Sequence, residues 1–105
     1  MADPQTLTAA VDRLADRFRS MPQSRLLGPV DGHPSRAAAV LALAAGLAGR
    51  ALAAAGEPAR EFPDAGPFAV GDQLAVAGRE LAAVAGPAEL AAAVAEVEAV
   101  DRLTA

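Results

Sequence analysis

Residues 35–56 read SRAAAVLALAAGLAGRALAAAG, and this stretch decides the fold class. Ala and Leu are the strongest helix formers, and no Pro interrupts the run. Ser35 suits the N-cap because its hydroxyl can accept a hydrogen bond from a free backbone amide, while Gly56 and Pro58 end the helix. Because the stretch is apolar on most faces, we expect a helix over 35–55 that is the central and most buried helix of the protein.

The same stretch has nearly the length of a membrane span, and Arg50 argues against that interpretation. A span needs about 18 uninterrupted apolar residues, and a central Arg opposes insertion by roughly 2.5–3.5 kcal/mol. Arg50 interrupts the apolar run that begins at Ala37. We therefore expect a buried helix and no membrane span.

Three further helices are predicted, over residues 4–21, 68–85 and 87–102. Each has apolar residues at spacings of three and four, which places them on one face of a helix. These stripes are Leu7, Val11, Leu14, Phe18 and Met21; Val70, Leu74, Ala77, Leu81 and Val84; and Leu90, Val94, Val97 and Val100. We expect an all-α fold, a compact four-helix bundle-like domain that occupies residues 1–105 as a single domain.

The breaks between these helices are rich in Pro and Gly. Residues 22–34 and 57–67 each contain several of them, which forbids regular structure. In the first break, residues 24–27 can form one short turn that folds Leu26 and Leu27 back onto the core. The second break is a Pro-rich loop between the second and third long helices.

Small residues form a stripe on each of two predicted helices. Gly inside a helix costs about 0.5–1 kcal/mol relative to Ala, so its recurrence suggests a compensating contact. The stripes are Ala42, Gly46, Gly49 and Ala53 on the second helix and Gly71, Ala75, Gly78 and Ala82 on the third. Our hypothesis is that the two stripes face each other at close range, which would offset the shortage of large side chains.

Composition excludes several classes of function. The chain has no Cys, which removes disulfides and thiolate chemistry, and only 3% of its residues are aromatic. Its pI near 4.8 and the absence of Lys make nucleic acid a poor partner. The amino-terminal residues show no basic stretch followed by an apolar run, so we expect a cytoplasmic protein.

Charge divides unevenly between the two halves of the chain. Residues 1–56 contain six Arg and four Asp, whereas residues 57–105 contain three Arg and nine acidic residues. Attraction between the halves would dock the first long helix against the last, or pair two copies of the chain.

Residues that could carry catalysis or bind a metal are sparse. His33 is the only His, and a zinc site usually needs three or four ligands. A Ser-His-Asp relay with Ser24 or Ser35 lacks the G-x-S-x-G turn. We therefore expect a non-enzymatic protein with no metal and no cofactor.

The second break and the start of the third helix form the candidate interaction surface. Two of the three Phe lie there beside rigid Pro residues and polar groups, and stiff aromatic residues in loops are common binding elements. The candidate residues are Phe62, Asp64, Phe68, Asp72 and Gln73. The competing interpretation is that Phe62 and Phe68 only plug the two ends of an Ala-rich core.

We expect a helical protein-interaction module that binds a protein partner or a second copy of itself, as a homodimer. Two alternatives stay open. One is a small-molecule-binding domain with a pocket near Phe62 and Phe68. The other is a compact DNA-binding regulator, if the amino-terminal arginines cluster on one exposed helix. Those arginines are Arg13, Arg17, Arg19, Arg25 and Arg36.

Overall fold

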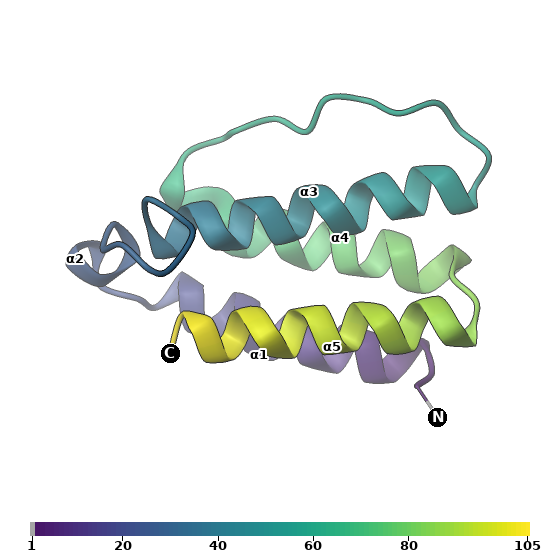
Figure 1. Ribbon diagram of the computed structural model, residues 1–105, viewed down its shortest axis with the longest axis horizontal. Coiled ribbons are helices and arrows are strands. Elements are labelled where there is room, and N and C mark those ends of the chain that lie inside the picture. The colour runs from purple at the N-terminus through teal and green to yellow at the C-terminus, as the bar shows by residue number, and fades with distance from the viewer. Residues whose placement is uncertain (1) are drawn as a thin grey trace.

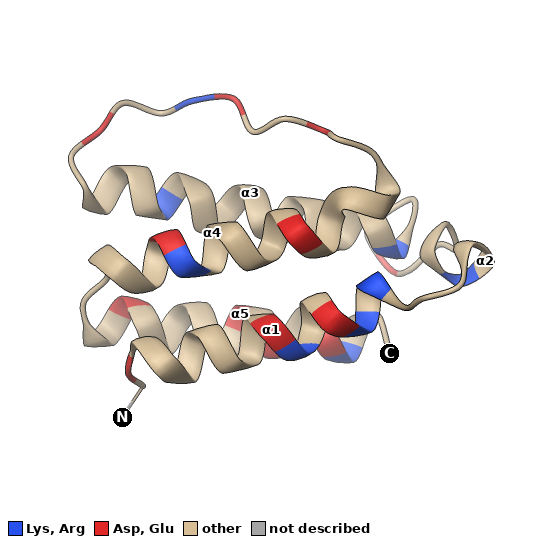
Figure 2. Ribbon diagram, turned by 180° about the vertical axis from the view of Figure 1, so that it is seen from behind, with Lys and Arg blue, Asp and Glu red and all other residues tan. Residues whose placement is uncertain are grey.

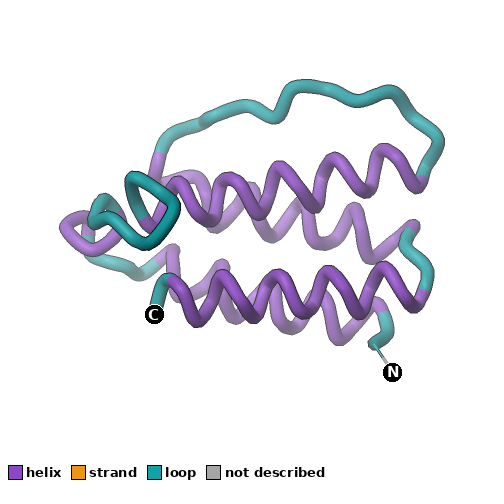
Figure 3. Tube along the Cα trace, viewed as in Figure 1, coloured by secondary structure: helices purple, strands orange, loops and turns teal. Residues whose placement is uncertain are grey.

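The computed structural model describes residues 2–105, in which four long helices lie side by side (Figure 1). These helices are α1 (Pro4–Arg19), α3 (Arg36–Ala54), α4 (Val70–Val84) and α5 (Pro87–Leu103); the short elements are α2 (Gln23–Leu26) and the 3-10 turn η1 (Pro67–Ala69). No strand forms in this part of the chain (Figure 3). The predicted all-α class with four main helices is confirmed, and each predicted helix end lies within two residues of the observed one.

The core consists mainly of Leu and Val side chains. The largest fully buried side chains are Leu7, Leu14, Leu26, Leu47, Leu74, Leu81, Val11, Val40, Val70, Val97 and Thr104. Leu26 of α2 is among them, whereas its neighbour Leu27 is 46% exposed. The predicted fold-back onto the core is therefore correct for Leu26 and wrong for Leu27.

The direction of the helices sets their connections. Helices α3 and α4 run in one direction, and α1 and α5 run in the opposite direction (Figure 1). Helix α4 packs against both α3 and α1, and α5 contacts the same two helices. Seven of the 15 residues of α4 are buried, compared with seven of 19 in α3. The prediction that the Ala-rich helix over 35–55 is the most buried is therefore wrong: α4 is the central helix.

Helix α3 keeps an open face. Its small residues Ala42, Gly46, Gly49 and Ala53 are all exposed. By length and composition α3 could also cross a membrane, and 39% of the 18-residue window that meets this test is buried inside the molecule. The core helix of a soluble protein meets the same test.

Because α3 and α4 run in parallel, the chain must return along the bundle between them. Helix α3 has 19 residues and is therefore about 28 Å long, a distance that about nine extended residues can span. Residues 57–66, here named the strap, make this return along α3 (Figure 1). Pro58 and Pro63 lack an amide donor and so keep the strap out of helix.

Side chains cap two of the helix starts, and the cap at Ser35 was predicted. The Asp3 carboxylate accepts a hydrogen bond from the Thr6 amide at 2.8 Å, and this bond lowers the pKa of Asp3. The Ser35 hydroxyl accepts one from the Ala38 amide at 3.0 Å, which confirms its role as N-cap. Both side chains satisfy amides that have no partner inside the helix.

The glycines of α4 lie against α1 and not against α3. A Cβ at Gly78 would come within 2.8 Å of both Val11 methyls, and a Cβ at Gly71 would come within 2.9 Å of the Ala15 carbonyl oxygen. A Cβ at Gly46 or Gly49 of α3 would meet no atom within 4 Å. The hypothesis of two facing stripes is therefore wrong. Two helices do approach closely, but they are α4 and α1. The glycines of α4 face Val11 and the Ala15 backbone of α1, and the spacing of small residues could not reveal this pairing.

The last turn of α5 is held by two arginines from other helices. Arg17 Nη1 of α1 donates to the Thr104 carbonyl oxygen at 2.9 Å, and its Nη2 donates to Thr104 Oγ1 at 2.7 Å. Arg36 Nε of α3 donates to the same carbonyl oxygen at 3.1 Å. Arg17 also pairs with Asp101 at 2.8 Å, so the first and last long helices are joined through opposite charges as predicted. Cations at a helix C-terminus satisfy its free carbonyls and favour its dipole.

A matched pair of substitutions tests the close approach of α4 to α1. Both Gly78→Ala and Gly49→Ala gain the same helix propensity, about 0.5–1 kcal/mol. The new methyl at position 78 must displace the stiff Val11, at a cost of about 1–3 kcal/mol. We expect urea unfolding to show Gly78→Ala less stable and Gly49→Ala more stable than the native chain. Equal effects at the two positions would contradict this packing.

The arginine clamp on α5 is tested by Arg17→Ala. Loss of the guanidinium leaves Thr104 and its carbonyl without these donors, which we expect to lower the free energy of unfolding by about 1–3 kcal/mol. Hydrogen exchange at the Thr104 amide should accelerate as the last turn frays. The exposed Arg13 of the same helix serves as control, and Arg13→Ala should change stability by about 0.5 kcal/mol or less. A similar loss in both variants would show that the clamp contributes nothing specific.

Candidate interaction surface

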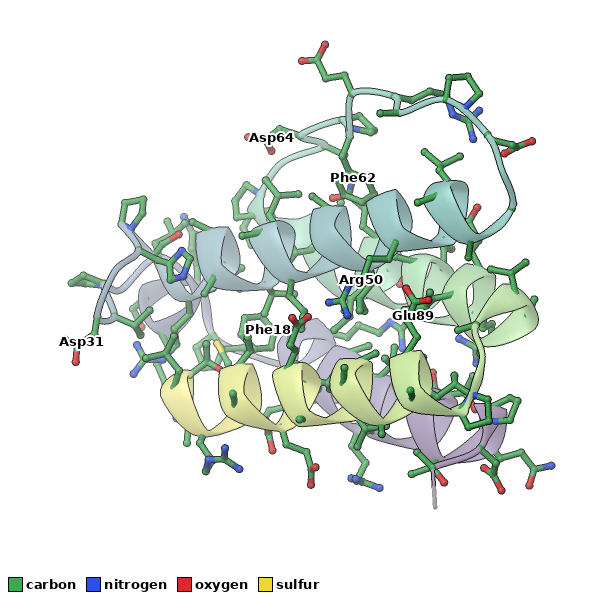
Figure 4. The ribbon with its side chains drawn as sticks, turned by 45° about the vertical axis from the view of Figure 1, so that its right-hand side comes forward. Phe18, Asp31, Arg50, Phe62, Asp64 and Glu89 are labelled. Atoms are coloured by element: carbon green, nitrogen blue, oxygen red, sulfur yellow. The ribbon has the colours of Figure 1, made fainter. Side chains whose placement is uncertain are left out.

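The structure brings three of the five predicted surface residues together. Phe62 of the strap packs against the core and lies near Asp72 and Gln73 of α4. In Figure 4 the Phe62 side chain points from the strap toward the helices. Asp64 lines a different hollow, and Phe68 is 71% exposed. The idea that both Phe residues plug the core is thus correct for Phe62 and wrong for Phe68.

The three residues line a shallow groove between the strap and α4, here named the Phe62 groove. It has a volume of about 290 Å³, and its lining is mostly apolar. The lining residues are Phe62, Pro63, Asp72, Gln73, Val76, Ala77 and Glu80. On the other side of Phe62, a second hollow of about 270 Å³ lies between the strap and α3 and also reaches Glu80. Phe62 is therefore a wedge between two hollows.

Gln73 fastens the strap to α4. Its Nε2 donates a hydrogen bond to the Pro63 carbonyl oxygen at 2.8 Å. Its Oε1 is buried and accepts no hydrogen bond from any residue in the range 2–105. An unsatisfied buried acceptor costs about 1–3 kcal/mol, and such groups gather at functional positions.

Asp72 lies at the rim of the groove and is tied to α1. Its Oδ1 accepts a hydrogen bond from Arg19 Nε at 2.8 Å, and Arg19 Nη1 donates to Asp16 at 2.7 Å. The hydrogen bond to Asp72, followed by that to Asp16, raises the pKa of Arg19 above its ordinary value. Because Arg19 forms ion pairs with two carboxylates, it neutralises the negative charge of Asp72 only in part.

Asp64 has a local role in shaping the end of the strap. Its Oδ1 accepts a hydrogen bond from the Gly66 amide at 2.9 Å, which forms a tight turn. Gly66 has φ of +93°, a conformation that favours glycine. Asp64 therefore positions the strap and does not line the Phe62 groove.

Four residues of the groove were not predicted from the sequence, namely Pro63, Val76, Ala77 and Glu80, and Val76 is the most informative of them. It is 59% exposed although it is a large apolar residue in the middle of α4. It falls outside the apolar stripe that runs from Val70 to Val84, so its position on the polar face of the helix was the available signal. Val76 lies one turn after Asp72, and Phe68 lies one turn before Asp72, so two large apolar side chains at the start and middle of this segment are exposed to solvent.

The amino-terminal arginines are distributed over three helices, and two of them, Arg17 and Arg25, line one hollow together with Arg102 of α5. Arg17 and Arg36 bind the end of α5, and Arg19 pairs with Asp72. On α1 and α4, Arg positions lie beside acidic positions (Figure 2). The five arginines therefore do not all lie on one exposed helix.

His33 lies in the turn before α3. Its backbone exchanges hydrogen bonds with Val30, and its side chain is half-buried. Among residues 2–105, no group of three or more His, Cys, Asp or Glu side chains converges to hold a metal ion.

The anchoring of the strap is tested by Gln73→Ala. Loss of the bond to Pro63 should open the strap more often, and a net hydrogen bond of about 0.5–1.5 kcal/mol corresponds to roughly 2- to 12-fold faster trypsin cleavage after Arg60. Mass spectrometry identifies that cut. Gln5→Ala on the exposed side of α1 is the matched control and should leave the cleavage rate unchanged. An unchanged rate in Gln73→Ala would show that the strap is held by other contacts.

Comparison with protein-family models, with curated proteins and with solved structures gave no match to this chain. Function belongs to sites and not to folds, so an inference about the Phe62 groove must follow from its own residues. These combine a mostly apolar lining, the exposed Val76 and the carboxylates of Asp72 and Glu80.

Proposed function

We propose that this chain is a non-enzymatic protein-interaction module that binds a partner through the Phe62 groove together with Val76 and Phe68. The observation that carries the proposal is the exposure of Val76 (59%) in the lining of an apolar groove, together with the exposure of Phe68 (71%) eight residues earlier, just before α4. Single exposed apolar residues are ordinary on protein surfaces, but apolar residues that gather around a concave feature are typical of binding sites.

The energetics favour a modest affinity. Full burial of a Val or Phe side chain contributes about 1.5–3 kcal/mol, and association costs several kcal/mol in lost freedom. The surface around one shallow groove is smaller than the roughly 800 Å² per partner of a stable interface. A dissociation constant in the micromolar range is therefore expected, as in transient regulatory contacts.

The shape of the groove bears on the small-molecule alternative. Ligand pockets usually enclose about 300–1,000 Å³ and cover most of the ligand. The Phe62 groove is at the lower end of that range and is formed by a strap and one helix face. A protein segment that covers Val76 as well as the groove suits it better than a small molecule does.

Site-specific photo-crosslinking tests this proposal. A photoreactive phenylalanine analogue at position 68 should give a discrete adduct with the partner in the native host. The same analogue at Ala92, an exposed position of α5, should give none. The variant Val76→Ser should abolish the adduct at position 68 while the free energy of unfolding changes by about 0.5 kcal/mol or less, because residue 76 is exposed.

Two outcomes would refute the proposal. One is equal crosslinking from positions 68 and 92, and the other is an adduct that Val76→Ser leaves intact. An adduct with twice the mass of the chain identifies a second copy as the partner, and sedimentation at several concentrations would then show self-association that Val76→Ser weakens.

A further inference from the structure

The rim of the Phe62 groove carries negative charge that the molecule does not neutralise. Glu80 lines the groove and the adjoining hollow, and Glu61 lines the hollow on the other side of Phe62. Within residues 2–105, no cationic group lies within ion-pair distance of either carboxylate.

The nearby arginines are engaged elsewhere. Arg79 of α4 pairs with Asp12 at 3.0 Å. Arg60 of the strap lies 3.9 Å from Glu57 and lines the second hollow, but it does not line the Phe62 groove. Arg19 of α1 forms ion pairs with both Asp16 and Asp72. The groove is therefore an apolar trough with a net negative rim.

The groove also has an unsatisfied acceptor at its edge. Gln73 Nε2 holds the strap, which leaves Gln73 Oε1 buried with no donor in residues 2–105. A buried oxygen is out of reach of a partner, so the two free carboxylates alone set the unmatched charge of this surface. Complementarity requires a partner that supplies cations.

We propose that the partner segment is a basic amphipathic helix, with apolar residues on one face flanked by Arg or Lys; this inference rests on the proposed function of the Phe62 groove. A helix suits the site because α4 presents ridges of side chains into which another helix can pack. Residues 2–105 form no strand whose edge could accept an extended peptide. From Asp72 to Glu80 the groove follows nine residues of α4, a rise of about 12 Å, so two to three turns of the partner cover it.

Helix α1, the helix of this chain that combines basic residues with a strong apolar stripe, is not available to a second copy. In α1, which has basic residues and a strong apolar stripe, the stripe is buried in the core. Arg17 and Arg19 of that helix already pair with Asp101 and Asp72. The charges therefore favour a foreign helix over self-association.

Binding of two designed peptides to the full chain tests the inference. The probe is a fluorescent 18-residue helical peptide with Leu and Ala on one face and Arg along both flanks of that face. The control peptide is identical except that it carries Glu in place of Arg. Fluorescence anisotropy at low salt should give a dissociation constant at least about tenfold lower for the Arg peptide, and added salt should weaken its binding.

Variants place the interaction on the groove. Glu80→Gln and Glu61→Gln should each weaken binding of the Arg peptide by about 2- to 5-fold, since one exposed ion pair contributes that much. Glu98→Gln, at an exposed and unpaired position of α5, should leave it unchanged. Val76→Ser should weaken binding by roughly tenfold through lost apolar contact.

The outcomes separate this inference from the proposal on which it rests. If both peptides bind equally and Val76→Ser weakens both, the basic partner is refuted while the groove remains an interaction surface. If neither peptide binds, or if Glu98→Gln acts like Glu80→Gln, this inference is refuted. Self-association that Val76→Ser abolishes would also refute it, because a second copy would then be the occupant.

Discussion

The parallel orientation of α3 and α4 is the constraint from which the candidate interaction surface arises. Two neighbouring helices that run in the same direction cannot be joined by a short turn, so residues 57–66 return along the whole length of α3 (Figure 1). Pro residues keep this strap extended, and its only aromatic residue, Phe62, is wedged onto the core. The groove beside α4 exists because the strap lies there and is fastened by Gln73.

The helices that support the strap are held together by close approach of their backbones more than by large buried side chains. Gly71 and Gly78 let α4 approach the Ala15 backbone and Val11 of α1, where a methyl group would clash. Arg17 and Arg36 then bind the last turn of α5 from two other helices. With few large side chains available, these contacts fix which helices are neighbours and so leave the Val76 side of α4 open to solvent.

Local features of the fold could be read from the sequence, because they depend on neighbouring residues. Asp3 and Ser35 cap their helices, and Gly and Pro break the chain where expected. The pairing of helix faces could not be read, because spacing defines a stripe without saying what it meets. The glycines of α4 therefore pack against α1 and not against α3 as expected. Thr104 is buried beneath arginines that lie far away in the sequence. At the candidate surface, Phe62, Asp72 and Gln73 were predicted because aromatic and polar residues lie beside Pro there. Val76 could have been predicted only from its position outside the apolar stripe of its helix.

The most direct test of this account is whether the strap lies on α4 in solution. Nuclear Overhauser effects between the Gln73 side-chain amide protons and protons of Pro63 and Asp64 report that contact, because Gln73 Nε2 lies 2.8 Å from the Pro63 carbonyl oxygen. The account predicts these effects together with dispersed chemical shifts for residues 57–66. Random-coil shifts for the strap and no effect from the Gln73 amide would contradict it.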